Sequence, residues 1–287
     1  MAGGSANPAG MLYLVATPIG NAEDISARAI RVLSEVDLIA CEDTRRTSRL
    51  LAAHSIRTPT LSYFEHNESR RVPELVTRLR AGEHIALVTD AGTPTISDPG
   101  YRLVRSAIDT GIQVTAVPGP SAVIAALAVA GLPTDRFAFE GFLPSKAGER
   151  QRALAQLATE ERTLVVYEAA RRLPRLLSEL IAPFGPDRQL AVVREATKTH
   201  EEILRGTLAE LAESFANREV LGEVTLVIDG AHGSRDAIAS SAMDESRIVN
   251  VLREAGLSLK DASAAASKIT GASRREVYQN AIRRESN

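Results

Sequence analysis

The sequence has one cysteine and no tryptophan among its 287 residues. With Cys41 alone, an internal disulfide is excluded and no second cysteine is present for a zinc cluster. No apolar run approaches the roughly 20 residues that cross a bilayer, so we predict no membrane contact. Residues 1–10 carry neither a basic n-region nor an apolar h-region, and we expect a disordered tail rather than a signal peptide. These absences favour a cytoplasmic protein.

The chain also lacks an excess of charge of either sign. Its 34 Lys and Arg residues nearly balance 36 Asp and Glu residues, for a net charge of -2. The surface as a whole therefore does not favour nucleic acid, and any RNA contact must come from a local basic cluster. The hydrophobic content of 44% is typical of a soluble globular protein, and the length is typical of two domains.

Short apolar runs alternate with helical patterns through the first half of the chain. The predicted strands are Met11–Ala16, Val36–Ala40, Ile85–Val88 and Gln113–Val117. The predicted helices are Asp24–Leu33, Arg45–Ala53, Ser69–Arg80, Tyr101–Asp109 and Ser121–Ala130. This alternation predicts a largely parallel sheet with helices on both faces, in an N-terminal α/β domain over residues 11–131.

The second half predicts another α/β domain over residues 132–230. Its predicted strands are Phe137–Phe142, Thr163–Tyr167, Gln189–Arg194, Glu202–Leu204 and Val224–Asp229. Its predicted helices are Gly148–Ala158, Arg172–Ile181 and Leu208–Ala216. Some strands follow one another closely, so we expect a mixed sheet. The cleft between the two domains is the natural place for a ligand.

A small, polar stretch over residues 231–243 indicates a linker before a helical C-terminal module at 244–287. Three short helices are predicted there, and Ser273 with Glu276 forms a capping box that opens the last one.

Loops rich in Gly, Pro and Thr follow several of the predicted strands, notably Thr17–Asn21, Thr89–Gly100 and Pro118–Ser121. The carboxyl ends of parallel strands form the ligand edge of such a sheet, and glycine lets the backbone approach a ligand closely. Asp90 follows directly on a strand and can accept hydrogen bonds from a ribose or an amine. Each loop alone is also compatible with a simple tight turn. None has a dinucleotide or P-loop fingerprint, so neither ligand is favoured.

Ordered blocks of the sequence resemble the family of ribosomal RNA small subunit methyltransferases I, in the tetrapyrrole methylase (class III) superfamily. The blocks include LYLVATPIGNAEDIS, CEDTRRTSRLL, ALVTDAGTPTISDPGYRLV and VPGPSAVIAALAVAGLPTDRFAFEGFLP. The resemblance implies two α/β domains with a cofactor cleft between them, S-adenosylmethionine as methyl donor without a metal, and a homodimer. It further implies 2′-O-methylation of a cytidine ribose in the decoding region of 16S rRNA, on small-subunit rRNA or the assembled small subunit.

Carried over residue by residue, the resemblance implies a set of cofactor contacts. They are Pro18, Gly20, Asp90, Ala91, Gly92, Thr93, Ser121, Ala122, Tyr167 and Ala196. One block departs from the family pattern, which has Glu-Ser-Pro-His-Arg where this chain has Glu168-Ala169-Ala170-Arg171-Arg172. The Ser and His of that block are therefore absent from this chain.

Methyl transfer to a hydroxyl benefits from a base or a nearby cation, and three polar clusters contain candidates. We expect Asp43, Glu65 and Lys198 near the acceptor ribose. Each cluster also has a structural interpretation. Glu42 and Arg45 are typical of a charge pair at a helix start, and His66 is typical of a hydrogen-bonding loop residue. The third cluster, Arg194, Glu195 and Lys198, is typical of a salt-bridge network.

Basic residues in two segments are candidates for RNA phosphate contact. Arg45 and Arg46 lie in the first, and Arg274 and Arg275 begin the last predicted helix, where the helix dipole does not favour positive charge. A solvated helix face explains the second pair equally well. Two other functions stay open: a class III methyltransferase for a tetrapyrrole or a protein, and a non-catalytic RNA-binding factor in ribosome assembly.

Overall fold

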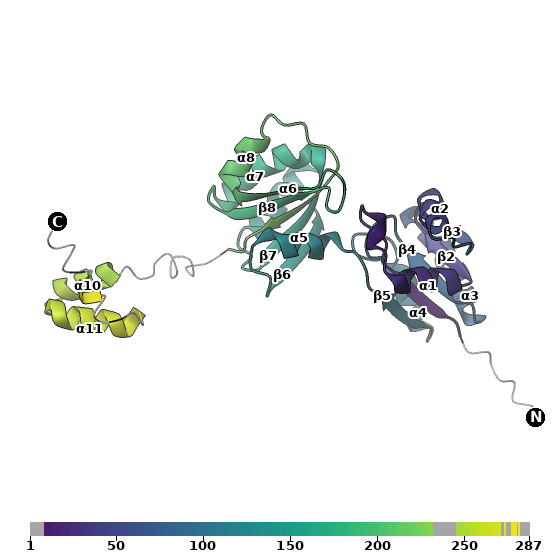
Figure 1. Cartoon of the computed structure of the whole chain (residues 1–287), viewed down its shortest axis with the longest axis horizontal. Helices are drawn as coiled ribbons and strands as arrows, with labels where there is room; N and C mark the ends of the chain where they lie inside the picture. Colours follow the sequence, from purple (N-terminus) through teal and green to yellow (C-terminus); the bar gives the residue numbers. More distant parts are fainter. Residues whose placement is uncertain (1–8, 232–244, 271–272, 274–276, 280, 282–287) are drawn as a thin grey trace, which may run out of the picture. The chain divides into compact units, whose positions relative to one another are not determined.

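The structure is a computed structural model, and it describes residues 9–231, 245–270, 273, 277–279 and 281 (Figure 1). The chain divides into two compact units, residues 1–229 and 230–287. The first unit holds two five-stranded sheets, and the second holds helices.

The first sheet is entirely parallel, as the βα alternation predicts. Its strands are β1 (Met11–Val15), β2 (Leu38–Cys41), β3 (Thr60–Ser62), β4 (Ile85–Val88) and β5 (Gln113–Val117). They lie in the order β3-β2-β4-β1-β5. The edge strand β3 was not predicted, because three residues are too short to show a period.

Helices cover both faces of this sheet, since successive side chains of a buried strand point to opposite sides. In β4, Ala86 and Val88 pack under α1 (Ala27–Glu35) and α2 (Thr44–Ala53). On the other face, Ile85 and Leu87 pack under α3 (Glu68–Arg80) and α4 (Tyr101–Asp109). Two short 3-10 turns, η1 (Ala22–Asp24) and η2 (Glu65–Asn67), follow β1 and β3. The strand ends therefore open into loops at a single edge.

The second sheet is mixed, which confirms the expectation from its closely spaced strands. Its strands are β6 (Phe137–Phe142), β7 (Thr163–Ala169), β8 (Gln189–Arg194), β9 (Glu202–Thr207) and β10 (Glu223–Ile228). They lie in the order β6-β7-β10-β8-β9, and only the β6–β7 pair is parallel.

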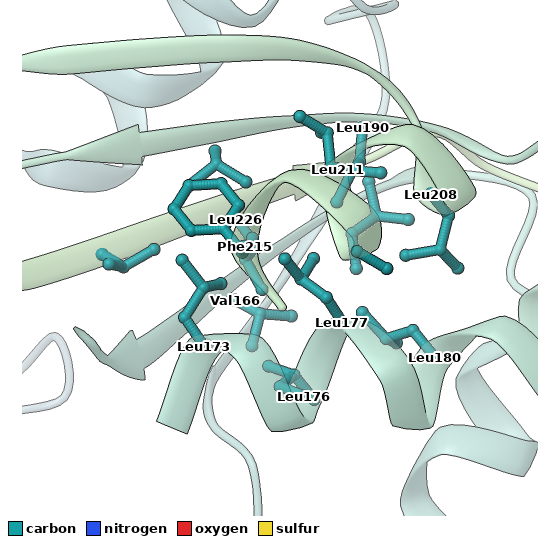
Figure 2. Close-up of a cluster of buried hydrophobic side chains, with 14 of the residues drawn as sticks. Val166, Leu173, Leu176, Leu177, Leu180, Leu190, Leu208, Leu211, Phe215 and Leu226 are labelled. Carbon is teal, nitrogen blue, oxygen red and sulfur yellow. The ribbon is translucent and has the colours of Figure 1, made fainter. Parts of the chain in front are cut away.

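One face of the second sheet is covered by α6 (Ala147–Leu157), α7 (Leu173–Phe184) and α8 (Leu208–Phe215), with a short turn η3 (Ala170–Arg172) before α7. Figure 2 shows Leu173, Leu177 and Phe215 packed toward Val166 and Leu226 of the sheet. Burying a leucine or phenylalanine in this way contributes roughly 1.5–3 kcal/mol each, so this layer fixes the sheet as a rigid support.

The opposite face is covered by α5 (Ala122–Ala130), a helix made only of apolar residues. Val123, Ala126 and Leu127 pack there against Val165 and Val227 of the second sheet. Residues 122–130 fall within our predicted first domain, yet their buried side chains join the core of the second sheet. The chain division at residues 131 and 132 stays a prediction.

The second compact unit contains α10 (Glu245–Glu254) and α11 (Leu259–Thr270). Val249 packs against Ala262, Ala266 and the helical residue Val277. Ser258 caps the second of these helices, where its Oγ accepts the Asp261 N–H at 3.2 Å. Arg274, Arg275, Glu276 and nearly all of the predicted linker lie outside the described residues. Within the described part of the chain, we find no helix with the length and apolarity needed to cross a membrane.

Candidate active site

A cavity of about 360 Å³ lies where the strand-end loops of the first sheet meet the second sheet. From the first sheet and its loops it is lined by Ile19, Ala91, Gly92, Thr93, Ile96, Ser97, Asp98, Ser121 and Ala122. From the second sheet it is lined by Phe142, Tyr167, Glu168, Ala169, Val193, Ala196, Gly222, Glu223, Val224 and Thr225. This volume lies within the range of sites for small ligands.

The loops after β1 and β4 are tied together by backbone hydrogen bonds. Thr17 N–H donates to Gly92 O at 2.9 Å, and Gly92 N–H donates back to Thr17 O at 3.0 Å. The Thr17 hydroxyl also donates to Thr89 O at 3.0 Å. Gly92 has a φ of +82°, a left-handed conformation that glycine adopts without a steric penalty. The loops therefore form one wall of defined shape.

Residues 93–100 continue this wall with an unusual backbone. Thr95 and Ser97 both have positive φ, at +76° and +60°, which is uncommon outside glycine, especially for a β-branched residue. The loop ends where Gly100 N–H donates to Glu68 Oε1 at 2.9 Å. Glu68 is buried and also accepts the Tyr63 hydroxyl at 2.8 Å. Strain of this kind persists only where the surroundings hold it, and it is concentrated at functional sites.

The N-terminus of α5 points its first turn at the cavity. Ser121 caps this helix by accepting the Ile124 N–H, and the Val123 N–H bonds to the Tyr167 hydroxyl. The Ala122 N–H has no partner among the residues that the structure describes. Free N–H groups at a helix start favour a negatively charged or carbonyl oxygen.

Aromatic rings form part of the second wall. Tyr167 lies between Phe139 and Phe142, with ring centroids 4.9 Å and 5.5 Å away. Burial raises the pKa of the Tyr167 hydroxyl, and the negative charge of Asp98 adds to this effect. Phe142 is 58% exposed although it lines the cavity, so its ring is available to a ligand.

Carboxylates of the second wall are neutralised by cations. Glu168 is 3% exposed and accepts the Arg172 Nε at 2.6 Å. Lys198 Nζ donates to Glu195 at 2.8 Å and to Glu223 at 3.0 Å. Partial burial opposes the charge of Lys198, but these two hydrogen bonds outweigh it and raise the pKa of the ammonium. Lys198 is therefore held as a cation.

The first wall instead gathers carboxylates. Burial and the charge of Asp90 raise the pKa of Glu42, which follows β2. Burial, the charge of Glu42 and that of Asp90 raise the pKa of Asp98 to about 7, against the lowering effect of the Thr89 hydroxyl. Asp90 accepts the Asp43 N–H at 3.0 Å and lies 3.4 Å from the Arg46 guanidinium.

The predicted cofactor residues divide between three places. The larger group lines the cavity of about 360 Å³ and consists of Ala91, Gly92, Thr93, Ser121, Ala122, Tyr167 and Ala196. Pro18 and Asp90 line a separate cavity of about 100 Å³ together with Arg46. Gly20 lies against Ala196, Thr197 and the Lys198 side chain, so that a Cβ there would overlap them. Their roles stay predictions.

The predicted catalytic residues Asp43, Glu65 and Lys198 do not line either cavity. No hydrogen bond or ion pair in the described part of the chain joins any two of them. Asp43 caps α2, where its Oδ1 accepts the Arg45 N–H at 2.8 Å, and this bond lowers the pKa of the carboxyl. Glu65 is exposed in η2. The contacts of Asp43 and Lys198 are those of a helix cap and of an ion-pair network.

Ile19, Asp98 and Phe142 are among the lining residues that were not predicted as site residues. Asp98 lies inside the Thr89–Gly100 loop that the sequence singles out. An acidic residue between a serine and Pro-Gly in a strand-end loop was the available signal. Phe142 gave none, because an aromatic residue at a strand end is ordinary.

Residues 11–212 match the family model of tetrapyrrole (corrin/porphyrin) methylases. The chain belongs to this family. Residues 239–285 match a second model, described as an RsmI C-terminal HTH domain. A protein of Xylella fastidiosa named ribosomal RNA small subunit methyltransferase I is 48% identical, over 94% of this chain and 98% of its own length. Proteins of the same name from Synechocystis and Pseudomonas aeruginosa are each 46% identical over 96% of this chain. The chain thus belongs with the relatives that carry this name.

Solved structures agree on the fold. Uroporphyrin-III C-methyltransferase from Thermus thermophilus has a TM-score of 0.56 at 21% identity, covering 80% of this chain and 98% of its own. A cobalt precorrin-4 methyltransferase has a TM-score of 0.55 at 19% identity, covering 80% and 97%. The predicted fold class is confirmed: it is an α/β fold of the tetrapyrrole methylase kind, with two sheets covered by helices and a helical C-terminal module.

Proposed function

We propose that this protein transfers a methyl group from S-adenosylmethionine to small-subunit ribosomal RNA. The finer proposal is methylation of a cytidine ribose 2′-hydroxyl in the decoding region of 16S rRNA. The observation that carries the coarser proposal is similarity to the Xylella protein over 98% of that protein's length, which includes the C-terminal module, and the finer proposal follows from the resemblance of the sequence blocks. In this proposal the protein is a cytoplasmic homodimer.

The cavity of about 360 Å³ suits the proposed methyl donor. Ile19, Tyr167 and Val193 supply apolar surface for a purine ring, and the free Ala122 N–H suits a carboxylate. The Glu223 carboxylate, which also lines this cavity, suits an amine or ribose hydroxyls. The bound cofactor would supply a methyl group activated on a sulfonium sulfur, and this chemistry needs no metal.

The protein's own contribution is placement. Hydrogen bonds between the β1 and β4 loops and the strained 93–100 segment keep the donor side rigid, and rigid placement of reactants lowers the barrier to transfer. The exposed Phe142 ring offers a surface on which an RNA base can stack, a contact worth about 1–3 kcal/mol per base.

RNA phosphates would be met by arginines outside the cavity. The Arg45 side chain is 86% exposed, and Arg46 is bound on one side by Asp90. Arg274 and Arg275 of the C-terminal module are the second proposed contact. A match to a helix-turn-helix model over residues 239–285 supports nucleic-acid binding by that module.

The two alternative functions differ from the proposed one in substrate or in the need for a cofactor. The uroporphyrin-III enzyme, whose name gives a tetrapyrrole substrate, is 21% identical to this chain, a level that speaks for the fold alone. A non-catalytic assembly factor would have no need of a cofactor cavity, and calorimetry with S-adenosylmethionine separates it from an enzyme.

The test is a tritiated-methyl assay on small ribosomal subunits and on naked rRNA from a strain that lacks the protein. Nucleoside analysis of the product should place the label on a cytidine ribose. Label on a base would disprove the finer proposal, and label on neither substrate would disprove the function.

A further inference from the structure

Three carboxylates line the cavity of about 360 Å³, and they differ in how they are neutralised. Glu168 is bound by Arg172, and Glu223 by Lys198. Asp98 has no cationic partner among the described residues, and its polar contact is the neutral Thr89 hydroxyl. It is the carboxylate of this cavity that can take up a proton without breaking an ion pair.

Asp98 is surrounded by groups that favour its uptake of a proton. Glu42 faces it from the loop after β2, Asp90 from the loop after β4, and Tyr167 from β7. Arg46 forms an ion pair with Asp90, and both residues line the smaller cavity of about 100 Å³. The negative charges make a proton on Asp98 favourable, while partial exposure leaves a route to water.

The backbone before Asp98 holds its carboxylate in place. Ser97 and Thr95 have positive φ, and the Gly100 N–H is bonded to the buried Glu68. The carboxylate is therefore set into the cavity by a strained and anchored loop rather than by an ion pair of its own.

We infer that Asp98 accepts the proton of the substrate hydroxyl during methyl transfer, an inference that rests on the proposed function. The hydroxyl oxygen forms a bond to the methyl carbon as the carbon–sulfur bond breaks and its electron pair stays on sulfur. The hydroxyl proton passes to an Asp98 carboxylate oxygen and then to water, which restores the carboxylate. Atoms and charge balance without a metal or a further reactant.

A carboxyl group with a pKa of about 7 suits this step, because a base is most effective when its pKa lies near the working pH. Lys198 does not suit it, since its ion pairs raise the pKa of the ammonium. The Asp43 carboxyl, with its lowered pKa, is a weaker base than Asp98.

The decisive variant is Asp98→Asn, which keeps the shape and removes the base. We expect the rate constant for methyl transfer at pH 7.5 to fall about 10²–10⁴-fold, with the calorimetric Kd for S-adenosylmethionine changed less than about threefold. Asp109→Asn, at the exposed end of α4, is the matched control and should keep the wild-type rate. A rate within tenfold of wild type, or a loss explained by weaker cofactor binding, would overturn the inference.

The pH profile gives a second measurement. The wild-type rate should rise through about pH 7 as Asp98 ionises, and Asp98→Asn should lack this rise. Glu42→Gln removes a neighbouring negative charge and should move the rise to lower pH. Thr89→Val removes a hydrogen bond to the carboxylate and should move it to higher pH. If the rise in rate occurs at the wild-type pH in both variants, the assignment of this rise to Asp98 is wrong.

A third measurement needs neither cofactor nor activity. In ¹³C NMR of the cofactor-free protein, one carboxyl resonance should titrate near pH 7 and be absent from Asp98→Asn. An Asp98 resonance that titrates near pH 4 would overturn the inference. If the wild-type protein labels no RNA at all, the proposed function itself fails, and the inference fails with it.

Discussion

The two walls of the cavity treat charge in opposite ways. On the second-sheet wall each acidic side chain is matched by a cation, as in Glu168 with Arg172 and Glu223 with Lys198. On the first-sheet wall, burial and the charge of Asp90 raise the pKa of both Glu42 and Asp98, and the charge of Glu42 adds to the rise at Asp98. We call the second-sheet wall, whose carboxylates pair with cations, the scaffold wall. We call the first-sheet wall, where carboxylates lie close to one another, the acidic wall.

This difference separates support from chemistry. A buried ion pair keeps its protonation state over a wide pH range, so it can position a ligand but cannot exchange protons readily. Nearby negative charge raises the pKa of a carboxyl group, so that the group can exchange protons closer to neutral pH. Mutations on the scaffold wall should therefore cost stability, while mutations on the acidic wall should cost little stability or even restore some.

The largest expected effect is on the scaffold wall, from Arg172→Ala. This change leaves the buried Glu168 without its partner, and breaking one side of a buried ion pair costs about 3–5 kcal/mol. Because Arg172 is itself partly exposed, we expect the free energy of unfolding, measured with urea, to fall by about 2–4 kcal/mol. Arg175→Ala removes the exposed partner of Glu179 on α7 and is the control, with a cost below about 1 kcal/mol. Equal costs would remove the distinction between buried and exposed pairs.

A glycine on each wall provides the next comparison. Gly222 has a φ of +96°, and a Cβ there would overlap the Glu195 carboxylate that binds Lys198. Gly92 has a φ of +82°, but its Cβ would meet only the Ile19 side chain, at an ordinary 3.6 Å. Gly222→Ala should therefore cost about 2–3 kcal/mol and Gly92→Ala about 1 kcal/mol, both measured by urea unfolding. A larger loss of stability for Gly92→Ala than for Gly222→Ala would show that the Glu195 side chain moves aside at little energetic cost.

On the acidic wall, Asp98→Asn should stabilise the protein. The pKa of Asp98 rises from an unfolded value near 4 to about 7 on folding, so its favourable contribution is present below pH 4 and is lost as pH rises through 7. The variant's advantage should grow between pH 4 and 7 and stay constant above. Because the carboxyl is partly exposed, we expect about 1–2 kcal/mol at pH 8, by urea unfolding. If the variant is less stable than wild type at pH 8, electrostatic repulsion between the carboxylates does not destabilise this wall.

Much of the fold could be predicted from the sequence because its elements are long or strongly periodic. The limits of β4, α4 and β5 agree to the residue with the predicted ranges, and Gly111 and Pro118 mark the ends of α4 and β5. The strand β3 was missed for its shortness. Nothing local shows that α5 packs on the second sheet, since a helix apolar all round fits either neighbour.

The site was harder, because it depends on distant parts of the chain. Seven of the ten predicted cofactor residues line one cavity, since strand-end loops meet at a common edge. Charge partners follow no such rule. Asp43 is a helix cap and Lys198 bridges two glutamates 28 residues apart in number, Glu195 and Glu223. Burial and repulsion of Asp98 depend on Glu42 and Asp90 of other loops, and no spacing within its own loop reveals them.

The smallest expected effect lies outside both walls, at Arg45. Its side chain is 86% exposed and close to one charge, Asp43, so Arg45→Ala should change the free energy of unfolding by less than about 0.5 kcal/mol. If Arg45 meets one RNA phosphate, the slope of log Kobs against log salt should become shallower by about 0.7–0.9. Filter binding of a small-subunit rRNA fragment between 50 and about 200 mM salt measures this slope. Arg31→Ala, on α1 and paired with Glu35, is the matched exposed control and should leave it unchanged. An unchanged slope for Arg45→Ala would place RNA elsewhere on the surface, and an equal change in both variants would mean only a general effect of net charge.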